Sequence, residues 1–326
     1  MANPKFAKLQ AIIRSYKKVL VAFSGGSDSA FVLKVSRDVL GRENVLAVIA
    51  KSPSLPEREL KEAREIAVAL DSSLMEIETD EINNPQYKAN PVNRCYFCKS
   101  ELYSRLAPIA EKNNFQFVLN GTNQDDLGDW RPGLKAADEN GVKSPLVEAG
   151  FTKQEIRDVS KNIGLSTWSK PQAACLSSRI PFGTSISPEK LKQVERAEDL
   201  LKDLGFQVVR LRSLEAKAVI EVGSSETNHF FQNSEIREKT LSALKDIGFQ
   251  TIDLNLKGYQ PGRFNPGLSL RGNVPNDAEA IQEPRLLRRA NRSVPDDQAA
   301  NRRWIDRRRA SGPPRNDGRG LNRPER

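Results

Sequence analysis

Apolar and polar residues alternate along the first half of the chain with two different periods. Four apolar runs have the length and composition of buried strands, at residues 19–23, 44–50, 73–78 and 115–120. Before, between and after these runs, apolar residues recur every three or four positions, as in amphipathic helices, at residues 5–16, 30–40, 57–70, 100–113 and 153–163. This alternation predicts an α/β fold with a doubly wound parallel sheet, which binds ligands at the carboxyl ends of its strands.

The second half of the chain has shorter and more mixed segments. Helical periodicity covers residues 187–204 and 234–247, and strand character covers residues 206–211, 218–222 and 251–256. Ser187, Pro188 and Glu189 form a helix start, with the serine as N-cap, the proline at the first helical position and an acid in the first turn. These segments predict a smaller α+β domain.

The regular pattern ends near residue 258. Beyond it Pro, Gly, Asn and Arg dominate and apolar periodicity disappears, so the segment cannot bury enough surface to offset the entropy of ordering it. We therefore divide the chain into a domain of residues 1–170, a second domain of residues 171–262 and a basic disordered tail of residues 263–326.

Composition changes this picture only in part. The chain has 326 residues, is 38% hydrophobic and carries a formal net charge of +9, much of it from arginines in the tail. The folded part is closer to neutral, so a nucleic-acid partner is not expected. No apolar run approaches the roughly 20 residues that span a bilayer, and the first residues lack the apolar core of a signal peptide. We expect a cytoplasmic homo-oligomer with no membrane partner.

The segment after the first predicted strand carries the clearest chemical signal. Two glycines let its backbone turn tightly, while serine hydroxyls and the N-terminus of the next helix supply hydrogen-bond donors to an anion. Its residues are Ser24, Gly25, Gly26, Ser27, Asp28 and Ser29. The spacing is neither G-x-x-x-x-G-K-S/T nor G-x-G-x-x-G. We expect a bound anion of phosphate size.

The segment after the fourth predicted strand, GTNQDDLGD, begins at Gly121 and reaches the same edge of the sheet. Its carboxylates, Asp126 among them, could hold Mg²⁺ against phosphates, because this ion prefers oxygen ligands and one or two carboxylates commonly suffice. A solvated acidic loop is the alternative for any single aspartate.

Three cysteines, Cys95, Cys98 and Cys175, are too few and too odd in number for a disulfide framework. The CxxC pair is a half-site for zinc or an iron–sulfur cluster and is also a redox motif. His229, the only histidine, lies far away in sequence, so an ordinary zinc site is hard to complete. Cys175 precedes serines and Arg179, which favours its thiolate as a nucleophile, sulfur donor or third ligand. Simple buried thiols are the alternative.

Five segments together resemble one known family. SGGSDS is similar to the pyrophosphate loop of the ATP pyrophosphatases, here termed the PP-loop. With NRCYFCKSELY, GTNQDDLGDWRPG, SPLVEAGFTKQEIR and KPQAACLSSRIPFGTSI, in this order, it resembles the LarE family over about residues 5–265. LarE proteins are pyridinium-3,5-biscarboxylic acid mononucleotide sulfurtransferases, which make the organic part of the nickel-pincer nucleotide cofactor. The resemblance implies that ATP adenylates a substrate carboxylate, pyrophosphate leaves, and sulfur replaces AMP.

The resemblance also implies roles for individual residues. Residues 24–29 would bind the β and γ phosphates of ATP, with Mg²⁺ neutralising their charge. Further contacts to the nucleotide, the substrate phosphate or a metal would come from Gly121, Asp126, Arg179, Arg210, Arg212 and Glu221. The arginines at 210 and 212 and the glutamate at 221 are assigned by analogy with the second domain of the family, and solvated charges are the alternative for them.

The family contains two versions of the sulfur chemistry. In one subgroup the cysteine that matches Cys175 loses its sulfur and becomes dehydroalanine. In another, cysteines that match Cys95, Cys98 and Cys175 bind a [4Fe–4S] cluster with one open iron. Because this sequence has all three cysteines, we expect the cluster.

Two other functions share some of these features. tRNA-thiolation enzymes use the same loop with cysteines, but they predict nucleic-acid binding through the folded domains, whereas the basic charge here is concentrated in the tail. A non-catalytic nucleotide-binding or iron–sulfur sensor protein would bind ATP without releasing pyrophosphate.

Overall fold

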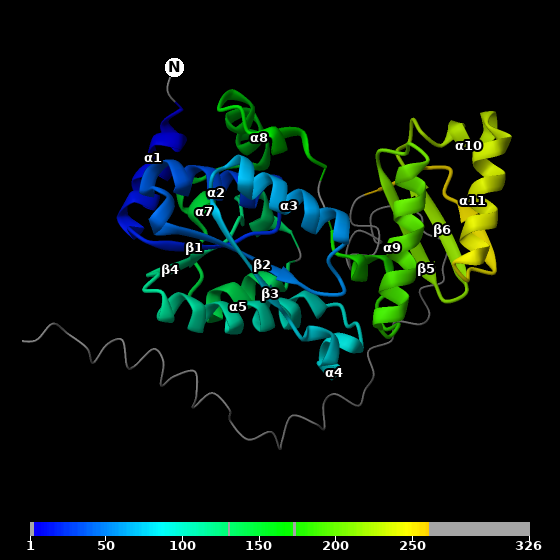
Figure 1. The fold of residues 1–326 in the computed structure, drawn as a ribbon, viewed down its shortest axis with the longest axis horizontal. Helices are drawn as coiled ribbons and strands as arrows, with labels where there is room; N and C mark the ends of the chain where they lie inside the picture. Colours follow the sequence, from blue (N-terminus) through cyan, green and yellow to red (C-terminus); the bar gives the residue numbers. More distant parts are fainter. Residues whose placement is uncertain (1–2, 130, 172–173, 261–326) are drawn as a thin grey trace, which may run out of the picture. The chain divides into compact units, whose positions relative to one another are not determined.

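The computed structural model describes residues 3–129, 131–171 and 174–260 (Figure 1). The tail predicted at residues 263–326 lies outside the described residues. Within the described ranges, no helix is long and apolar enough to cross a membrane.

The first sheet has four parallel strands in the order β3-β2-β1-β4 (Figure 1). The strands are β1 (Val19–Ala22), β2 (Val45–Lys51), β3 (Ser73–Glu78) and β4 (Phe117–Leu119). β1 lies in the middle, where Val21 pairs with Ala47 of β2 and with Leu119 of β4. The sheet therefore brings the chain after β1 close to the chain after β4.

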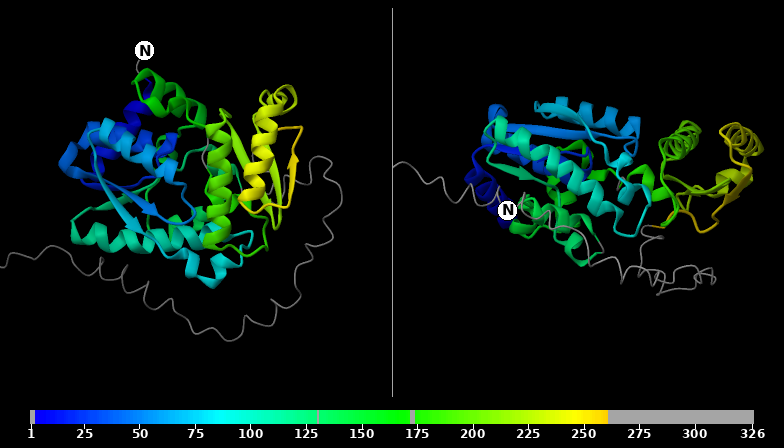
Figure 2. Two further views of the ribbon diagram at one scale, coloured as in Figure 1. Left: turned by 45° about the vertical axis from the view of Figure 1, so that its right-hand side comes forward. Right: turned by 90° about the horizontal axis from the view of Figure 1, so that it is seen from below.

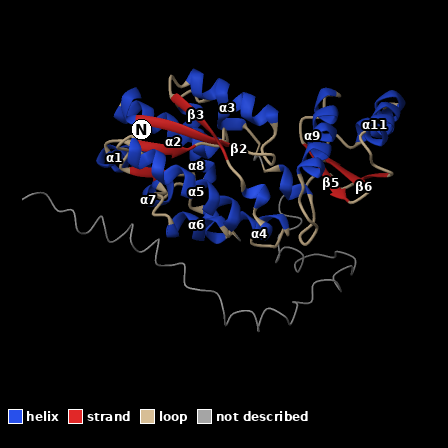
Figure 3. Cartoon of the chain, turned by 60° about the horizontal axis from the view of Figure 1, so that its bottom comes forward, coloured by secondary structure: helices blue, strands red, loops and turns tan. Residues whose placement is uncertain are grey.

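Helices cover both faces of this sheet. The helices are α1 (Pro4–Tyr16), α2 (Ser27–Leu40), α3 (Glu57–Ala69), α4 (Pro85–Lys88), α5 (Arg94–Lys112), α6 (Gly133–Glu139), α7 (Pro145–Ala149) and α8 (Lys153–Asn162). Val19 and Val21 belong to a core shared with α1, α2 and α3, whereas Leu20 belongs to a core shared with α5 and α6. Figure 3 shows the helices on the two sides of the sheet. Because successive strand residues face opposite sides, this alternation confirms the doubly wound α/β fold.

The predicted elements of this half agree with the structure to within a few residues, except for α5. We predicted that α5 begins at residue 100, but it begins at Arg94 and includes the CxxC segment in its first two turns. Tyr96 packs against the core beside α5 and α6, and Phe97 packs against another core, formed mainly by residues of the second half of the chain. Tertiary packing on both sides therefore extends the helix over residues with weak helix propensity.

A second sheet has the order β5-β6-β7, with β5 and β6 antiparallel and β6 and β7 parallel. Its elements are α9 (Pro188–Asp203), β5 (Val209–Leu214), β6 (Lys217–Val222), α10 (Asn228–Gln232), α11 (Ser234–Asp246) and β7 (Thr251–Leu254). α9 and α11 cover one face of this sheet (Figure 2). The Ser187 side chain accepts a hydrogen bond from the Lys190 backbone, which confirms the predicted N-cap. The domain boundaries at residues 170 and 262 stay predictions.

Candidate functional site

The PP-loop segment, residues 24–29, connects the carboxyl end of β1 to α2. Gly25 has φ +70°, a left-handed conformation that glycine adopts without strain. A Cβ atom at Gly25 would also lie 2.9 Å from the Cβ of Ala63 in α3. Backbone conformation and the close approach of α3 therefore both require glycine at this position.

The serines close the loop internally. The Ser29 hydroxyl donates to the Gly26 carbonyl at 3.1 Å and accepts from the Ser24 backbone at 3.2 Å. Gly26 is the N-cap of α2 and offers no side-chain cap, and the first N–H groups of a helix have no acceptor inside it. These donors and the positive end of the helix dipole form a site suited to a phosphate.

The segment after β4 packs directly on this loop. A Cβ atom at Gly121 would lie 2.8 Å from the backbone nitrogen of Ser29 and 3.0 Å from the carbonyl carbon of Asp28. The Asn123 amide donates to the Asp28 carboxylate at 3.0 Å. The structure thus brings together two segments that the sequence singled out separately. The helix after β1, α2, and the helix after β4, α6, pack into different cores. The two loops that lead to these helices therefore adjoin at the topological switch point, where α/β sheets bind ligands.

Asp126 is buried beside this contact. One of its oxygens accepts from the Asn123 backbone at 3.1 Å, and the other lies 2.8 Å from an Arg131 nitrogen. Burial raises the pKa of Asp126 above its ordinary value, and the charge of Arg131 opposes that rise. A direct role of Asp126 toward Mg²⁺ or nucleotide stays a prediction.

Lys170 also contacts the PP-loop, and sequence reasoning missed this residue. Its Nζ lies 3.2 Å from the Gly25 carbonyl oxygen and forms ion pairs with Glu59 at 2.8 Å and Glu62 at 2.7 Å. Burial lowers the pKa of Lys170, but hydrogen bonds to the two carboxylates outweigh burial, so the pKa is raised. The sequence marks this lysine only by its place before Pro171.

The three cysteines come from two separate parts of the chain. Cys95 and Cys98 lie one helical turn apart at the start of α5, and Cys175 is the N-cap of the short 3₁₀ helix Leu176–Arg179. Cys95 and Cys175 are exposed and Cys98 is half-buried. Burial raises the pKa of Cys98 to about 12. Desolvation of its sulfur by the surrounding protein and the charge of Cys175 also raise the pKa of Cys95, although the residue as a whole is exposed.

The three thiols are of the residue type that binds iron–sulfur clusters. Among the described residues, no group of three or more His, Cys, Asp or Glu side chains is arranged to hold a metal ion. A cluster places its thiolate ligands on different irons, so they lie farther apart than the ligands of a single ion. The predicted cluster is therefore taken up below as a proposal.

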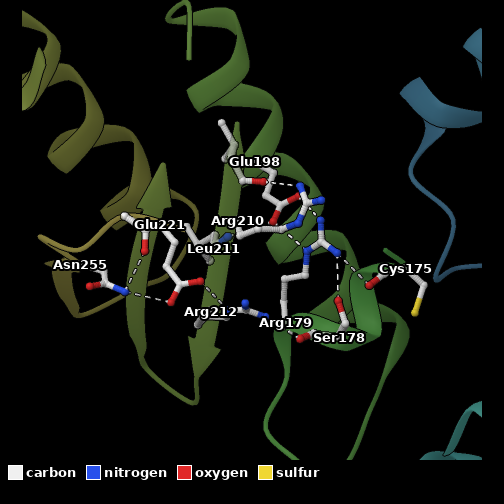
Figure 4. A network of polar contacts seen from close by, with 11 residues as sticks. Cys175, Ser178, Arg179, Glu198, Arg210, Leu211, Arg212, Glu221 and Asn255 are labelled. Carbon is white, nitrogen blue, oxygen red and sulfur yellow. Dashed lines mark hydrogen bonds and ion pairs between the residues drawn. The ribbon is translucent and has the colours of Figure 1, made fainter. Parts of the chain in front are cut away.

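Arg179 binds the backbone at Cys175 (Figure 4). One of its nitrogens donates to the Cys175 carbonyl at 3.0 Å and to the Ala174 carbonyl at 2.6 Å. The rest of the guanidinium is paired with Glu198, at 2.8 and 2.9 Å. In this structure Arg179 thus contacts the main chain of the Cys175 segment, and its predicted contact with a ligand remains untested.

Arg212 and Glu221 form a second buried pair, at 2.9 Å (Figure 4). Glu221 also accepts from Asn255 at 3.2 Å, and Arg212 donates to the Ser178 carbonyl at 2.9 Å. Burial lowers the pKa of Arg210, whose guanidinium lies 5.0 Å from the centre of the Tyr259 ring. The structure gathers these predicted residues on β5 and β6, and their roles toward phosphate or metal stay predictions.

Comparison with known proteins agrees with this geometry. The model of the NAD synthase family matches residues 6–111, which contain the PP-loop and the first three strands. Pyridinium-3,5-bisthiocarboxylic acid mononucleotide synthase of Lactiplantibacillus plantarum is 37% identical over 265 residues, which make up 81% of this chain and 95% of that protein. The chain belongs to the LarE family. The resemblance predicted from the five sequence segments is therefore confirmed.

Two other relatives extend over a similar part of the chain. An uncharacterised protein of Synechocystis sp. is 43% identical over 265 residues, covering 81% of this chain and 98% of the relative. An uncharacterised protein of Methanocaldococcus jannaschii is 31% identical over 244 residues, covering 75% of this chain and 91% of the relative. Both matches are long enough that all three cysteine positions of this chain lie within them.

Proposed function

We propose that this chain is an ATP-dependent sulfurtransferase acting on pyridinium-3,5-biscarboxylic acid mononucleotide in nickel-pincer nucleotide biosynthesis. ATP adenylates a carboxylate of this substrate and releases pyrophosphate. Sulfur then displaces AMP: the carbon–oxygen bond to AMP breaks and a carbon–sulfur bond forms. The Lactiplantibacillus relative, whose name describes a bisthiocarboxylic acid mononucleotide synthase, supports this choice of substrate.

The observation that carries the proposal is the contact between the PP-loop and the segment at Gly121 and Asn123. This contact lies at the switch point of the sheet, where the N-terminus of α2 offers backbone donors that suit an anion. Main-chain donors of residues 24–29 would bind the β and γ phosphates and stabilise the charge that grows on departing pyrophosphate. Mg²⁺ would neutralise the same phosphates, and Asp126 supplies a carboxylate on the adjoining segment.

Sulfur delivery is assigned to the cysteines. Cys95, Cys98 and Cys175 would hold a [4Fe–4S] cluster, which supplies sulfide when bound. The exposure of Cys95 and Cys175 gives a substrate access to this site. Arg210, Arg212 and Glu221, which converge on β5 and β6, would bind the substrate phosphate and a metal ion.

The adenylation half is tested by incubating anaerobically purified protein with ATP, Mg²⁺ and the pyridinium dicarboxylate mononucleotide. We expect substrate-dependent release of pyrophosphate and a thiocarboxylate product detected by mass spectrometry. Asp28→Ala should abolish both, while Asp38→Ala, an exposed position of the same helix, should leave both intact. Failure of the wild-type protein to release pyrophosphate with this substrate would contradict the proposal.

The sulfur half is tested by measuring iron and acid-labile sulfide after anaerobic purification. We expect about four irons per chain and a broad absorption band, both lost in Cys95→Ala. A protein without iron that loses the sulfur of Cys175 during turnover would instead be a sacrificial donor, and mass spectrometry of the Cys175 peptide would show it.

A further inference from the structure

Asn90, between α4 and α5, lies fully buried beneath the Cys175 segment. Its side-chain nitrogen lies within hydrogen-bond distance of the carbonyl oxygens of Pro181 at 2.7 Å, Thr184 at 3.0 Å and Ile180 at 3.3 Å. Its own carbonyl accepts from the Gly183 backbone at 2.9 Å. The two N–H groups of this amide are shared among three carbonyl oxygens, and together with the Gly183 contact they fix the loop that follows Cys175.

The same side chain reaches the helix that carries the CxxC pair. The Asn90 side-chain oxygen accepts from an Arg94 nitrogen at 2.6 Å, and that nitrogen also donates to the Ser177 carbonyl at 2.9 Å. Arg94 directly precedes Cys95 at the start of α5, and Ser177 lies two residues after Cys175. A continuous path of hydrogen bonds therefore joins the two cysteine-bearing segments.

Tyr87 in α4 adds a second link. Its hydroxyl lies 2.6 Å from the Ser177 hydroxyl. Tyr87 is 1% exposed, Ser177 and Asn90 are 0% exposed, and Arg94 is 4% exposed. These four residues, here called the clamp, form a polar network enclosed by the protein.

The clamp is unusual in both chemistry and backbone. Burying polar groups costs free energy unless each is hydrogen-bonded, and buried networks of satisfied groups specify one arrangement of the chain. Asn90 has φ +54°, a left-handed conformation that asparagine tolerates better than most residues. None of the hydrogen bonds described for the clamp involves the PP-loop, so ATP binding does not account for it.

We propose that Asn90 is a positioning residue that holds the Cys175 segment against the first turn of α5, so that Cys95 and Cys175 face a common site. The role assigned to that site rests on the proposed sulfurtransferase function. The positioning itself does not, because it concerns only the distance between two segments of this chain.

Thiol cross-linking of the metal-free, reduced protein tests the positioning without ATP, substrate or iron. A short bifunctional thiol reagent such as dibromobimane should link Cys95 to Cys175 in the wild-type protein, as identified by mass spectrometry of peptides. Absence of this product would overturn the proposed arrangement, whereas failure of pyrophosphate release would overturn only the proposed function.

Two substitutions at position 90 remove different parts of the clamp. Asn90→Gly suits the left-handed backbone and removes the side chain, and Asn90→Asp keeps the oxygen that faces Arg94 but removes the donors to the loop. Losing buried hydrogen bonds of this kind should lower the cross-linking yield about tenfold in both. The matched control Asn83→Ala, at an exposed position, should cross-link as the wild type does.

Thermal unfolding of each variant separates loss of positioning from loss of fold. A folded Asn90→Gly protein with an unchanged yield would overturn the proposal. Should both position-90 variants fail to fold, Tyr87→Phe decides the matter, because it removes one hydroxyl and keeps the buried ring. This substitution should lower the cross-linking yield about threefold. An unchanged yield would overturn the proposed positioning role of the clamp.

Discussion

Arg179 and Glu198 form a bidentate ion pair in which both side chains are 3% exposed. The Glu198 oxygen that faces the Arg179 Nε also accepts from the Leu211 backbone at 2.9 Å. The pair therefore connects the Cys175 segment, α9 and β5 (Figure 4). Because both side chains are buried and contact the backbone of these segments, the pair is a structural support for the cysteine site.

Removing one partner of this pair should destabilise the protein strongly. Glu198→Ala leaves the Arg179 guanidinium buried without its carboxylate, and breaking a buried pair in this way costs about 3–5 kcal/mol. Urea unfolding monitored by circular dichroism measures the change. Asp38→Ala, which removes an exposed pair with Lys34, is the control and should change the free energy of unfolding far less. Equal decreases in the free energy of unfolding of the two variants would contradict the claim that the buried pair contributes more to stability than the exposed pair.

A methyl group at Gly121 should disturb the PP-loop. Gly121→Ala would place its Cβ 2.8 Å from the Ser29 nitrogen, so the backbone of the loop must shift. A displacement of about 1 Å at a reacting group can lower turnover about a hundredfold. Substrate-dependent pyrophosphate release measures the effect. Gly128→Ala, where an added Cβ has no atom within 4 Å, should remain near wild type, and equal losses in the two variants would refute the steric argument.

The hydrogen bond between Asn123 and Asp28 can be tested by a substitution that keeps the shape of the side chain. Asn123→Asp keeps the oxygen that accepts from the Asp125 and Asp126 backbones, but it replaces the amide donor to Asp28 with a second carboxylate. The repulsion should lower kcat/KM for ATP about tenfold, and more at low ionic strength, where charges are less screened. Steady-state pyrophosphate release at two salt concentrations gives the answer. A variant with wild-type kinetics at both would show that this bond does not support the loop.

The raised pKa of Lys170 predicts that the free energy of unfolding depends on pH. Because its pKa is raised in the folded protein, its ion pairs with Glu59 and Glu62 stabilise the fold from neutral pH up to the ordinary lysine value, and this contribution disappears as pH rises through the folded-state pKa. Lys170→Met should therefore cost about 2 kcal/mol at neutral pH, and the difference from wild type should shrink above pH 10.5, the ordinary lysine pKa.

Urea unfolding of wild type and Lys170→Met from neutral to alkaline pH measures this difference. Lys34→Met, which removes the exposed pair with Asp38, provides the matched control. A difference that stays constant through alkaline pH would show that packing of the lysine stem, and not its charge, holds Glu59, Glu62 and Gly25 together.

Local sequence pattern was enough to predict most elements of the first half of the chain. β3 has the predicted bounds, and α8 ends within one residue of its prediction, because apolar periodicity records which face of each element is buried. The start of α5 was misplaced because the packing of Tyr96 and Phe97 against two cores, rather than local propensity, extends that helix.

The sequence by itself determined the class of the fold, the PP-loop at the end of β1 and the three cysteines as candidates for sulfur chemistry, since each depends on neighbouring residues or on residue type. Only the tertiary structure decided which distant groups meet. Lys170 reaches Gly25 across 145 positions, and Asn90 reaches Pro181 across 91. Nothing in the periodicity of either residue marks such a contact, because a hydrogen bond between remote segments depends on how the elements between them pack.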